Sequence, residues 1–197
     1  MKNKNLILAG VGGQGLVLTT QIISQAAFLS GLDVKTNDVI GLSQRGGTIW
    51  GSVKMGEQIH SPNIGPGEAD IIISFEKLEA KRWKHMLKSE GAISIINEYE
   101  IAPTLVQQGS KEYPEDILEL MSNRSKVISL DATKIAAKMG NPAMANILLL
   151  GIAAKYMDIK VETWFKVFED YLPPKFVELN KEAFMYGYEE DYLKTEI

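Results

Sequence analysis

The sequence predicts an α/β fold, on two observations. Short apolar runs of strand length alternate along the chain with longer segments in which apolar residues recur at helical spacing. Most of the strand candidates are continuously apolar, which is typical of strands buried on both faces by helices. The length of 197 residues suits one domain. We therefore expect a single domain over 1–197, a three-layer α/β/α (Rossmann-like) fold with a mostly parallel sheet and a helical C-terminal extension over about 158–197.

The first unit is a strand, a glycine turn and a helix. Residues 5–9 form an apolar run that stops at a glycine, and apolar residues recur at helical spacing over 14–28. Gly31 suits the position just after the helix end, and a second strand follows over 33–39. These elements predict a parallel strand–helix–strand unit.

Strands and helices continue to alternate after this unit. Residues 48–56 alternate between two kinds of side chain, which predicts a strand with two unlike faces. Apolar runs over 71–75 and 91–97 predict buried strands, with a helix over 76–87 between them. Residues 98–114 contain prolines and a glycine and predict one short strand at most.

Helical patterns dominate the last third of the chain. A helix is expected over 114–121, with Pro114 at its first position, where a missing N–H costs nothing. A strand over 126–130 follows, and the chain is then helical from Asp131 onward.

Two connections between the late helices are marked by their residue types. Gly140 can close one helix, Asn141 can cap the next, and Pro142 fits the first position of that helix. Pro173 and Pro174 separate the last two amphipathic helices.

Composition excludes several classes of function. The chain has no cysteine, which excludes disulfides, thiolate zinc sites, a cysteine nucleophile and iron–sulfur clusters ligated by this chain. A net charge of -4 with interspersed lysines and acids indicates no nucleic-acid partner, and no apolar run is long enough to predict a membrane span. The N-terminal lysines lead into glycines after five apolar residues, so no signal peptide is expected and the predicted location is cytoplasmic.

The glycine turn GVGGQG is the first candidate site. Gly10, Gly12 and Gly15 match G-x-G-x-x-G after a strand and before a helix, a pattern that brings backbone amides close to a phosphate. Gly13 and Gln14, at the helix N-terminus, would suit an anion or a partner's backbone. No Gly-Lys-Ser/Thr follows, which excludes a Walker-type loop. Since similar turns also serve helix–strand packing alone, a nucleotide-like ligand and a purely structural role both stay open.

The second candidate is a loop that combines one arginine with two glycines: Ser43, Gln44, Arg45, Gly46 and Gly47. An arginine fork beside glycines suits a carboxylate, a phosphate or a latch over a site shared with another subunit. A solvated surface charge is an equal alternative. In the predicted fold, both candidate loops and the turn at Asp131 lie at carboxyl ends of strands, where such sheets bind ligands.

The remaining polar residues show no catalytic constellation. His60 lies in a Pro/Gly loop, His85 lies on a helix, and neither has a carboxylate close in sequence. The acidic stretch 189–191 is expected to be a solvated helix face, and no metal-ligand spacing occurs.

Four stretches together resemble a known family: GVGGQG, SQRGG, HSPNIGPGEAD running into IIISFEKLEA, and GNPAMANILLLG. Their order and spacing over residues 5–155 are similar to the gamma-type domain of the 2-oxoacid:ferredoxin oxidoreductases. Ser43 and Gln44 stand before Arg45 where pyruvate- and oxoglutarate-type members tend to have Pro-Glu, so the chain most resembles the small (beta) subunit of the indolepyruvate branch.

The resemblance implies an accessory subunit, inactive alone, of an enzyme that decarboxylates an aryl 2-oxoacid such as indolepyruvate and forms acyl-CoA. Thiamine diphosphate and iron–sulfur clusters would lie on a large partner subunit, which passes electrons to ferredoxin. The isolated chain is expected to form a homo-dimer through its uncovered partner face. The family's two loops, which would face coenzyme A phosphates or the thiamine subunit, fall on Gly10, Gly12, Gly13, Gln14, Gly15, Ser43, Gln44, Arg45, Gly46 and Gly47.

Two other functions are compatible with the same fold, which does not choose among them. One is a free-standing nicotinamide-dependent dehydrogenase with Asp38, or Asp33, on the ribose; it needs a proton donor that the sequence does not show. The other is a non-catalytic interaction protein that lacks a catalytic partner.

Overall fold

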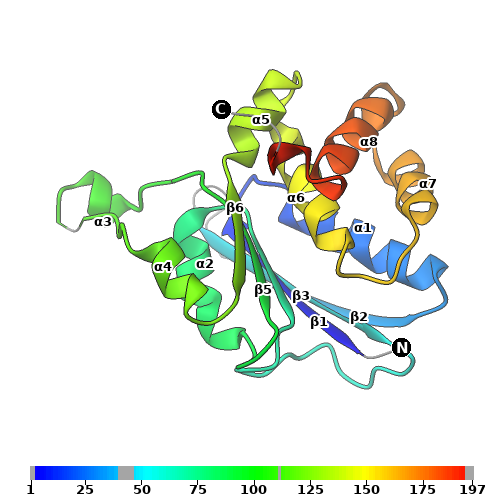
Figure 1. Ribbon diagram of the computed structural model, residues 1–197, viewed down its shortest axis with the longest axis horizontal. Helices are drawn as coiled ribbons and strands as arrows, with labels where there is room; N and C mark the ends of the chain where they lie inside the picture. Colours follow the sequence, from blue (N-terminus) through cyan, green and yellow to red (C-terminus); the bar gives the residue numbers. More distant parts are fainter. Residues whose placement is uncertain (1–2, 40–46, 111, 194–197) are drawn as a thin grey trace.

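The computed structural model describes residues 3–39, 47–110 and 112–193 (Figure 1). Its centre is one sheet of six strands in the order β2-β3-β1-β4-β5-β6. The neighbours β1, β4, β5 and β6 pair in parallel, and β3 is antiparallel to both β1 and β2. The strands are β1 Lys4–Val11, β2 Asp33–Val39, β3 Thr48–Gly56, β4 Ile71–Ser74, β5 Ile93–Asn97 and β6 Lys126–Leu130.

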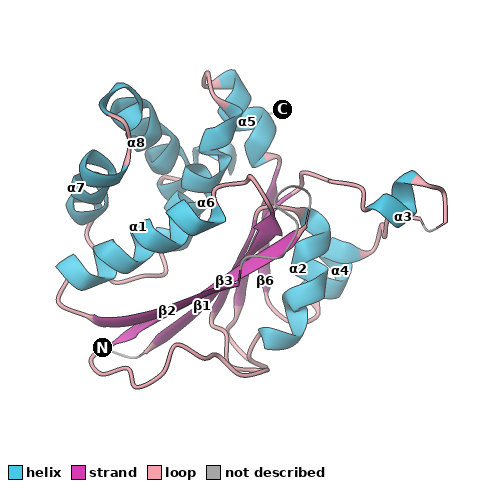
Figure 2. Cartoon of the chain, turned by 180° about the vertical axis from the view of Figure 1, so that it is seen from behind, coloured by secondary structure: helices cyan, strands magenta, loops and turns pink. Residues whose placement is uncertain are grey.

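Helices cover both faces of this sheet, so the predicted three-layer architecture is confirmed. Helices α1 and α6 lie on one face with α5, α7 and α8 around them, and α2 and α4 lie on the other face (Figure 2). The α-helices are α1 Leu16–Leu29, α2 Lys77–Trp83, α3 Thr104–Gln107, α4 Ile117–Ser122, α5 Ala132–Lys138, α6 Ala145–Ala154, α7 Val161–Tyr171 and α8 Pro174–Tyr188. Single 3-10 turns are η1 Lys84–Met86, η2 Pro142–Met144 and η3 Asp191–Leu193.

The continuous apolar runs of the central strands follow from this double cover. In β1, Leu6 and Leu8 belong to the core on the α1 and α6 side, whereas Ile7 between them belongs to the core on the α2 side. All three side chains are fully buried. Each such side chain contributes about 1.5–3 kcal/mol of burial free energy, so both layers are held by the same strand.

The predicted parallel strand–helix–strand unit is only half right. β2 does run in the same direction as β1, but β3 lies between them: Gly51 of β3 pairs with Leu8 on one side and with Asp38 on the other. β2 and β3, which are consecutive strands of the chain, pair antiparallel, and an antiparallel pair needs no crossover helix. Because β3 takes the place beside β1, β2 becomes an edge strand.

The helix ends and starts predicted from the sequence can be compared with the structure at two places. The α5–α6 connection is as predicted: Gly140 has φ +112°, and the Asn141 side chain accepts a hydrogen bond from the Ala143 N–H at 3.0 Å. The prediction that Pro114 begins a helix is wrong, because α4 begins at Ile117 after Asp116. A proline is permitted at a first helical position but does not require a helix there, because its fixed φ also suits an extended approach to a helix.

The C-terminal helices join the core through a close crossing of α6 and α8. A β-carbon on Gly151 would overlap the carbonyl oxygen of Phe184, and one on Gly187 would overlap that of Leu148. The two glycines therefore let the two helix backbones touch. Trp164 of α7 is also fully buried in this core.

Candidate functional site

The glycine turn lies at the topological switch point of the sheet. After β1 the chain turns into α1 on one face, and after the neighbouring β4 it turns into α2 on the other face. Open α/β sheets bind ligands in the crevice at such a point. The first candidate loop is therefore where its sequence context predicted it.

Each described glycine of this turn has a specific backbone role. Gly13 (φ +101°) and Gly15 (φ +79°) are in the left-handed region, which favours glycine. Gly15 is also the residue before α1 and provides no side-chain cap, so the first N–H groups of the helix are left for other partners. Gly10 lies within β1, and a β-carbon there would come within 2.9 Å of the Gln14 side chain. The N–H of Gly12 donates to the carbonyl oxygen of Gly47 at 3.0 Å, which joins the two candidate loops.

The side chain of Gln14 stabilises the glycine turn through two hydrogen bonds within this chain. Its Oε1 accepts a hydrogen bond from the Val11 N–H at 2.8 Å, and its Nε2 donates to the carbonyl oxygen of Phe75 at 2.8 Å. Both ends of the amide thus bind this chain and tie the β1–α1 turn to the end of β4. A contact between Gln14 and a ligand remains a prediction.

Asn97, at the end of β5, extends the same network. Its Nδ2 donates to the carbonyl oxygen of Phe75 at 3.1 Å and to Oγ1 of Thr133 at 2.8 Å. Its Oδ1 is buried and has no hydrogen-bond partner among the described residues. The carbonyl oxygen of Phe75 therefore accepts hydrogen bonds from two side-chain amides, those of Gln14 and Asn97, at the carboxyl ends of β1, β4 and β5.

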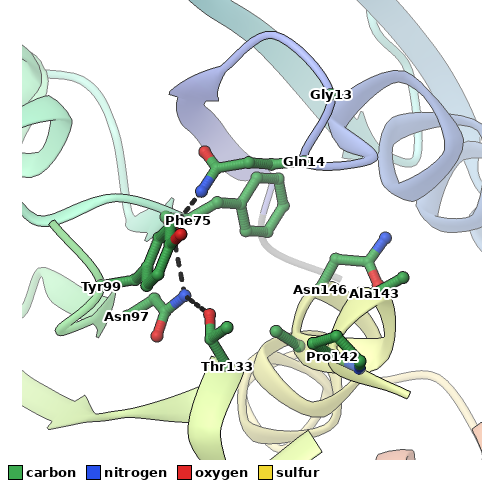
Figure 3. Close-up of a pocket in the computed structure, with 10 residues that line it drawn as sticks. Gly13, Gln14, Phe75, Asn97, Tyr99, Thr133, Pro142, Ala143 and Asn146 are labelled. Atoms are coloured by element: carbon green, nitrogen blue, oxygen red, sulfur yellow. Dashed lines mark hydrogen bonds between the residues drawn. The ribbon is translucent and has the colours of Figure 1, made fainter. Parts of the chain in front are cut away.

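These residues border a cavity of about 160 Å³ (Figure 3). Asn146 of α6 faces the glycine turn across it; its Oδ1 accepts from the Ile147 N–H at 2.8 Å, and its Nδ2 lies beside Gly15. Among the described residues, the lining contains no charged side chain: Gly13, Gln14, Phe75, Asn97, Tyr99, Thr133, Pro142, Ala143, Ala145 and Asn146. This part of the lining therefore suits a neutral group with an amide edge, and it provides no cation for a phosphate.

Only the end of the second candidate loop can be placed. Ser43, Gln44, Arg45 and Gly46 lie outside the described residues, and Gly47 lies against Gly12 as described above. A ligand contact by this loop stays a prediction.

A buried carboxylate, that of Glu79 on α2, lies beside Thr48, the first residue of β3, which follows the second candidate loop. Oε1 of Glu79 accepts from Oγ1 of Thr48 at 3.2 Å and pairs with Nη1 of Arg82 at 3.0 Å. Its Oε2 has no partner among the described residues. Burial raises the pKa of Glu79 to about 7, although the Arg82 charge and the Thr48 hydrogen bond oppose this shift. Sequence analysis missed this group, because one glutamate within EKLEAKRW carries no signal of burial.

The topology does not support the dinucleotide arrangement. In that arrangement the ribose-binding acid ends the strand next to the glycine strand. Here β3 separates β2 from β1, so Asp38 lies on a strand two spacings away, roughly 10 Å. Asp33 begins β2 and so lies at the other end of this strand from the glycine turn. Its carboxylate accepts from the Ile59 N–H at 2.7 Å and pairs with Lys35 at 3.0 Å.

The remaining titratable residues form no further centre within the described ranges. His85 contacts the Arg82 carbonyl oxygen at 3.1 Å and stacks on Trp83, away from the cavity lining. No group of three or more acids and histidines among the described residues is arranged to hold a metal ion. Over the same residues, no helix combines the length and the apolar character that a membrane span requires.

Comparisons with known proteins agree on one family. Residues 5–190 match the model of the pyruvate ferredoxin/flavodoxin oxidoreductase family. The indolepyruvate oxidoreductase subunit IorB of Pyrococcus horikoshii is 33% identical, with 95% of each chain covered. The IorB subunit of Archaeoglobus fulgidus is 34% identical, with 93% of each chain covered.

A solved structure gives the same fold. The 2-oxoglutarate:ferredoxin oxidoreductase of Magnetococcus marinus, solved with 2-oxoglutarate, coenzyme A and succinyl-CoA bound, matches with a TM-score of 0.76 and 19% identity. The match covers 100% of this chain and 32% of that larger chain.

Proposed function

Because the chain belongs to the pyruvate ferredoxin/flavodoxin oxidoreductase family, we propose that it is the small accessory subunit of an oxidoreductase acting on indolepyruvate or a related aryl 2-oxoacid. One observation carries this proposal: relatives named as indolepyruvate oxidoreductase subunits match nearly the whole chain at 33–34% identity. The chain is part of an oxidoreductase complex, and neither the dehydrogenase nor the non-catalytic alternative is favoured.

The redox centres belong to a larger partner subunit in this proposal. The residues of this chain do not fit those groups, since the sequence has no cysteine and the described residues form no metal-binding group. On the partner, thiamine diphosphate would supply the decarboxylation and iron–sulfur clusters the electron path to ferredoxin. The complex is expected in the cytoplasm, and the chain without its partner is expected to form a homo-dimer.

The contribution of this chain is a neutral pocket at the carboxyl edge of the sheet. The Magnetococcus enzyme was solved with coenzyme A bound, which makes this cofactor the first candidate ligand. The uncharged lining fits the neutral, amide-containing pantetheine end of coenzyme A better than its phosphates. Asn146 Nδ2 can donate a hydrogen bond there, and the glycine turn leaves room for close approach of the ligand. We assign the phosphates to cationic groups outside the cavity lining.

The proposal is tested by capturing the tagged chain from its native cells under anaerobic conditions. A large, cysteine-containing partner should co-purify, and the eluate should reduce viologen in a reaction that requires both indolepyruvate and coenzyme A. A chain that emerges alone and inactive would overturn the assignment.

The pocket is tested separately with the assembled complex. Ala143 lines the cavity from an exposed position, so Ala143→Trp should fill it and raise the KM for coenzyme A about tenfold while assembly is retained. Ala137→Trp, on the exposed side of α5 outside the lining, is the matched control and should leave this KM unchanged. Equal KM values for both variants would remove the pocket from the proposal.

A further inference from the structure

Residues 98–116, of which the structure describes all but residue 111, include an arm that projects from the body of the molecule. The arm leaves β5 at its carboxyl end and returns to α4, and α3 lies near its tip. Figures 1 and 2 show α3 standing apart from the sheet and its covering helices in both views. No other described helix or strand is in extensive contact with α3. The arm therefore adds little to the core of this chain.

A buried carboxylate fixes the base of the arm. Glu76 is 1% exposed, and its Oε1 accepts from the Ile101 N–H at 3.1 Å and from the Tyr113 hydroxyl at 2.7 Å. Its other oxygen accepts from the Glu79 N–H at 2.9 Å, at the start of α2. Both sides of the arm are thus tied to one helix terminus. The arm is held in place at its base even though its tip touches little else.

The arm carries an unusual share of the charge. It contains five acidic residues and one basic residue, so its formal charge of -4 equals that of the whole chain, and the rest of the chain is neutral on balance. Glu100 and Asp116 pair with Lys77 and Lys81 at the base, at 2.8 and 3.0 Å. The other acids are exposed.

Part of this charge surrounds a hollow that suits cationic side chains. The hollow has a volume of about 660 Å³ and is lined by Glu112, Tyr113, Pro114, Glu115 and Asp116. Glu112 and Glu115 are both exposed. Glu112 and Glu115 therefore place two exposed carboxylates at one opening, beside the Asp116 carboxylate that pairs with Lys81, and such a surface attracts Lys or Arg and repels an acidic surface.

The arm also begins at the rim of the candidate site. Asn97 lines the cavity, and Tyr99, which is 43% exposed, lines it two residues further along the chain. The arm starts between these two residues. A partner that covers the cavity therefore comes against the arm, because both lie at the same edge of the sheet. This continuity, independent of the charge, favours the catalytic partner over another occupant.

We propose that residues 98–116 are a docking arm that holds the large catalytic subunit, and that the partner surface it meets is basic. The inference rests on the proposed function, which supplies the partner. Complementary charge would act mainly on the association rate and on its dependence on salt.

The test uses the two subunits purified after co-expression, separated and recombined, with binding kinetics followed at 50 mM and 500 mM NaCl. The variant Glu112→Gln/Glu115→Gln should associate about tenfold more slowly at low salt, and the difference from the unmodified chain should shrink at high salt. The control Glu162→Gln/Glu182→Gln removes the same charge from exposed positions of α7 and α8 and should not slow association beyond about twofold.

A second variant tests the arm as a whole. Replacing residues 102–110 by a short Gly/Ser linker removes α3. It keeps the hydrogen bonds that Ile101 and Tyr113 donate to Glu76. The thermal midpoint of this variant alone should match that of the unmodified chain, whereas its assembly with the partner should be lost. Normal association of both arm variants at both salt concentrations would overturn the proposal. Failure of the unmodified chain to bind the large subunit would instead overturn the proposed function, and the arm inference with it.

Discussion

Nδ2 of Asn146 lies 2.5 Å from the position that a β-carbon on Gly15 would occupy. Asn146, the second residue of α6, thus meets the N-terminus of α1 beside the candidate cavity. Residue 15 must be glycine for two separate reasons, a φ of +79° and a lack of space beside Asn146.

Gly15→Ala should lower the free energy of unfolding by about 2–3 kcal/mol, since it adds a backbone penalty and displaces Asn146. Urea denaturation measures this loss. Gly13→Ala is the control, because its φ is +101° but no atom lies within 4 Å of its β-carbon position. Asn146→Ala should rescue part of the Gly15→Ala loss and none of the Gly13→Ala loss. Rescue of neither variant would show that the contact is unimportant.

Gln14→Ala should destabilise the chain by about 1–3 kcal/mol, because it leaves the Val11 N–H without its acceptor and removes a donor from the Phe75 carbonyl. The measurement is again the denaturation midpoint. Gln21→Ala, at an exposed position of α1, should change stability by less than about 0.5 kcal/mol. A Gln14 variant as stable as the Gln21 variant would mean that these two hydrogen bonds are not needed for folding.

Glu79 should make stability depend on pH. Its pKa in the folded chain, about 7, is higher than the ordinary glutamate value, so the folded state holds a proton that the unfolded state has released. The resulting stabilisation is complete below the ordinary pKa of about 4.3 and is lost as pH rises through 7. Between pH 5 and pH 8 the unmodified chain should lose about 1–3 kcal/mol relative to Glu79→Gln.

The measurement is urea unfolding of both proteins at these two pH values. Glu182→Gln, which changes an exposed carboxylate of α8, serves as the control and should track the unmodified chain. A constant difference between the Glu79 variant and the unmodified chain across this range would contradict the raised pKa.

Gly151→Ala should destabilise the chain by about 3 kcal/mol, because its methyl group would overlap the Phe184 carbonyl oxygen and push α8 from α6. The direction of the change in the free energy of unfolding is decisive, because Gly→Ala within an ordinary helix stabilises a protein by about 0.5–1 kcal/mol. Thermal unfolding decides it: a raised midpoint would mean that the two helices can separate at no cost.

Local signals in the sequence predicted most individual elements. The Gly140, Asn141 and Pro142 connection was correct because helix caps depend on residues one to three positions apart. The start of α4 was misplaced, because Pro114 fits both a first helical turn and an extended approach to one.

Strand order was beyond the reach of such signals. Residues 33–39 and 48–56 were both predicted as strands, and both are strands. That the second of them lies beside β1 depends on pairings between residues about forty positions apart, such as Leu8 with Gly51. The position of β3 between β1 and β2 argues against the dinucleotide-binding arrangement of a dehydrogenase, because it separates the strand of Asp38 from the strand that leads into the glycine turn.

The sequence by itself determined the α/β class, the glycine turn before α1 and, through family resemblance, the kind of enzyme to which the subunit belongs. Only the tertiary structure decided that Asn97, Thr133 and Asn146 meet at that turn, that Glu79 is buried, and that α3 stands clear of the body. The physical reason is that caps and periodicity act between near neighbours, whereas burial, cavities and strand pairing arise from segments that are distant along the chain.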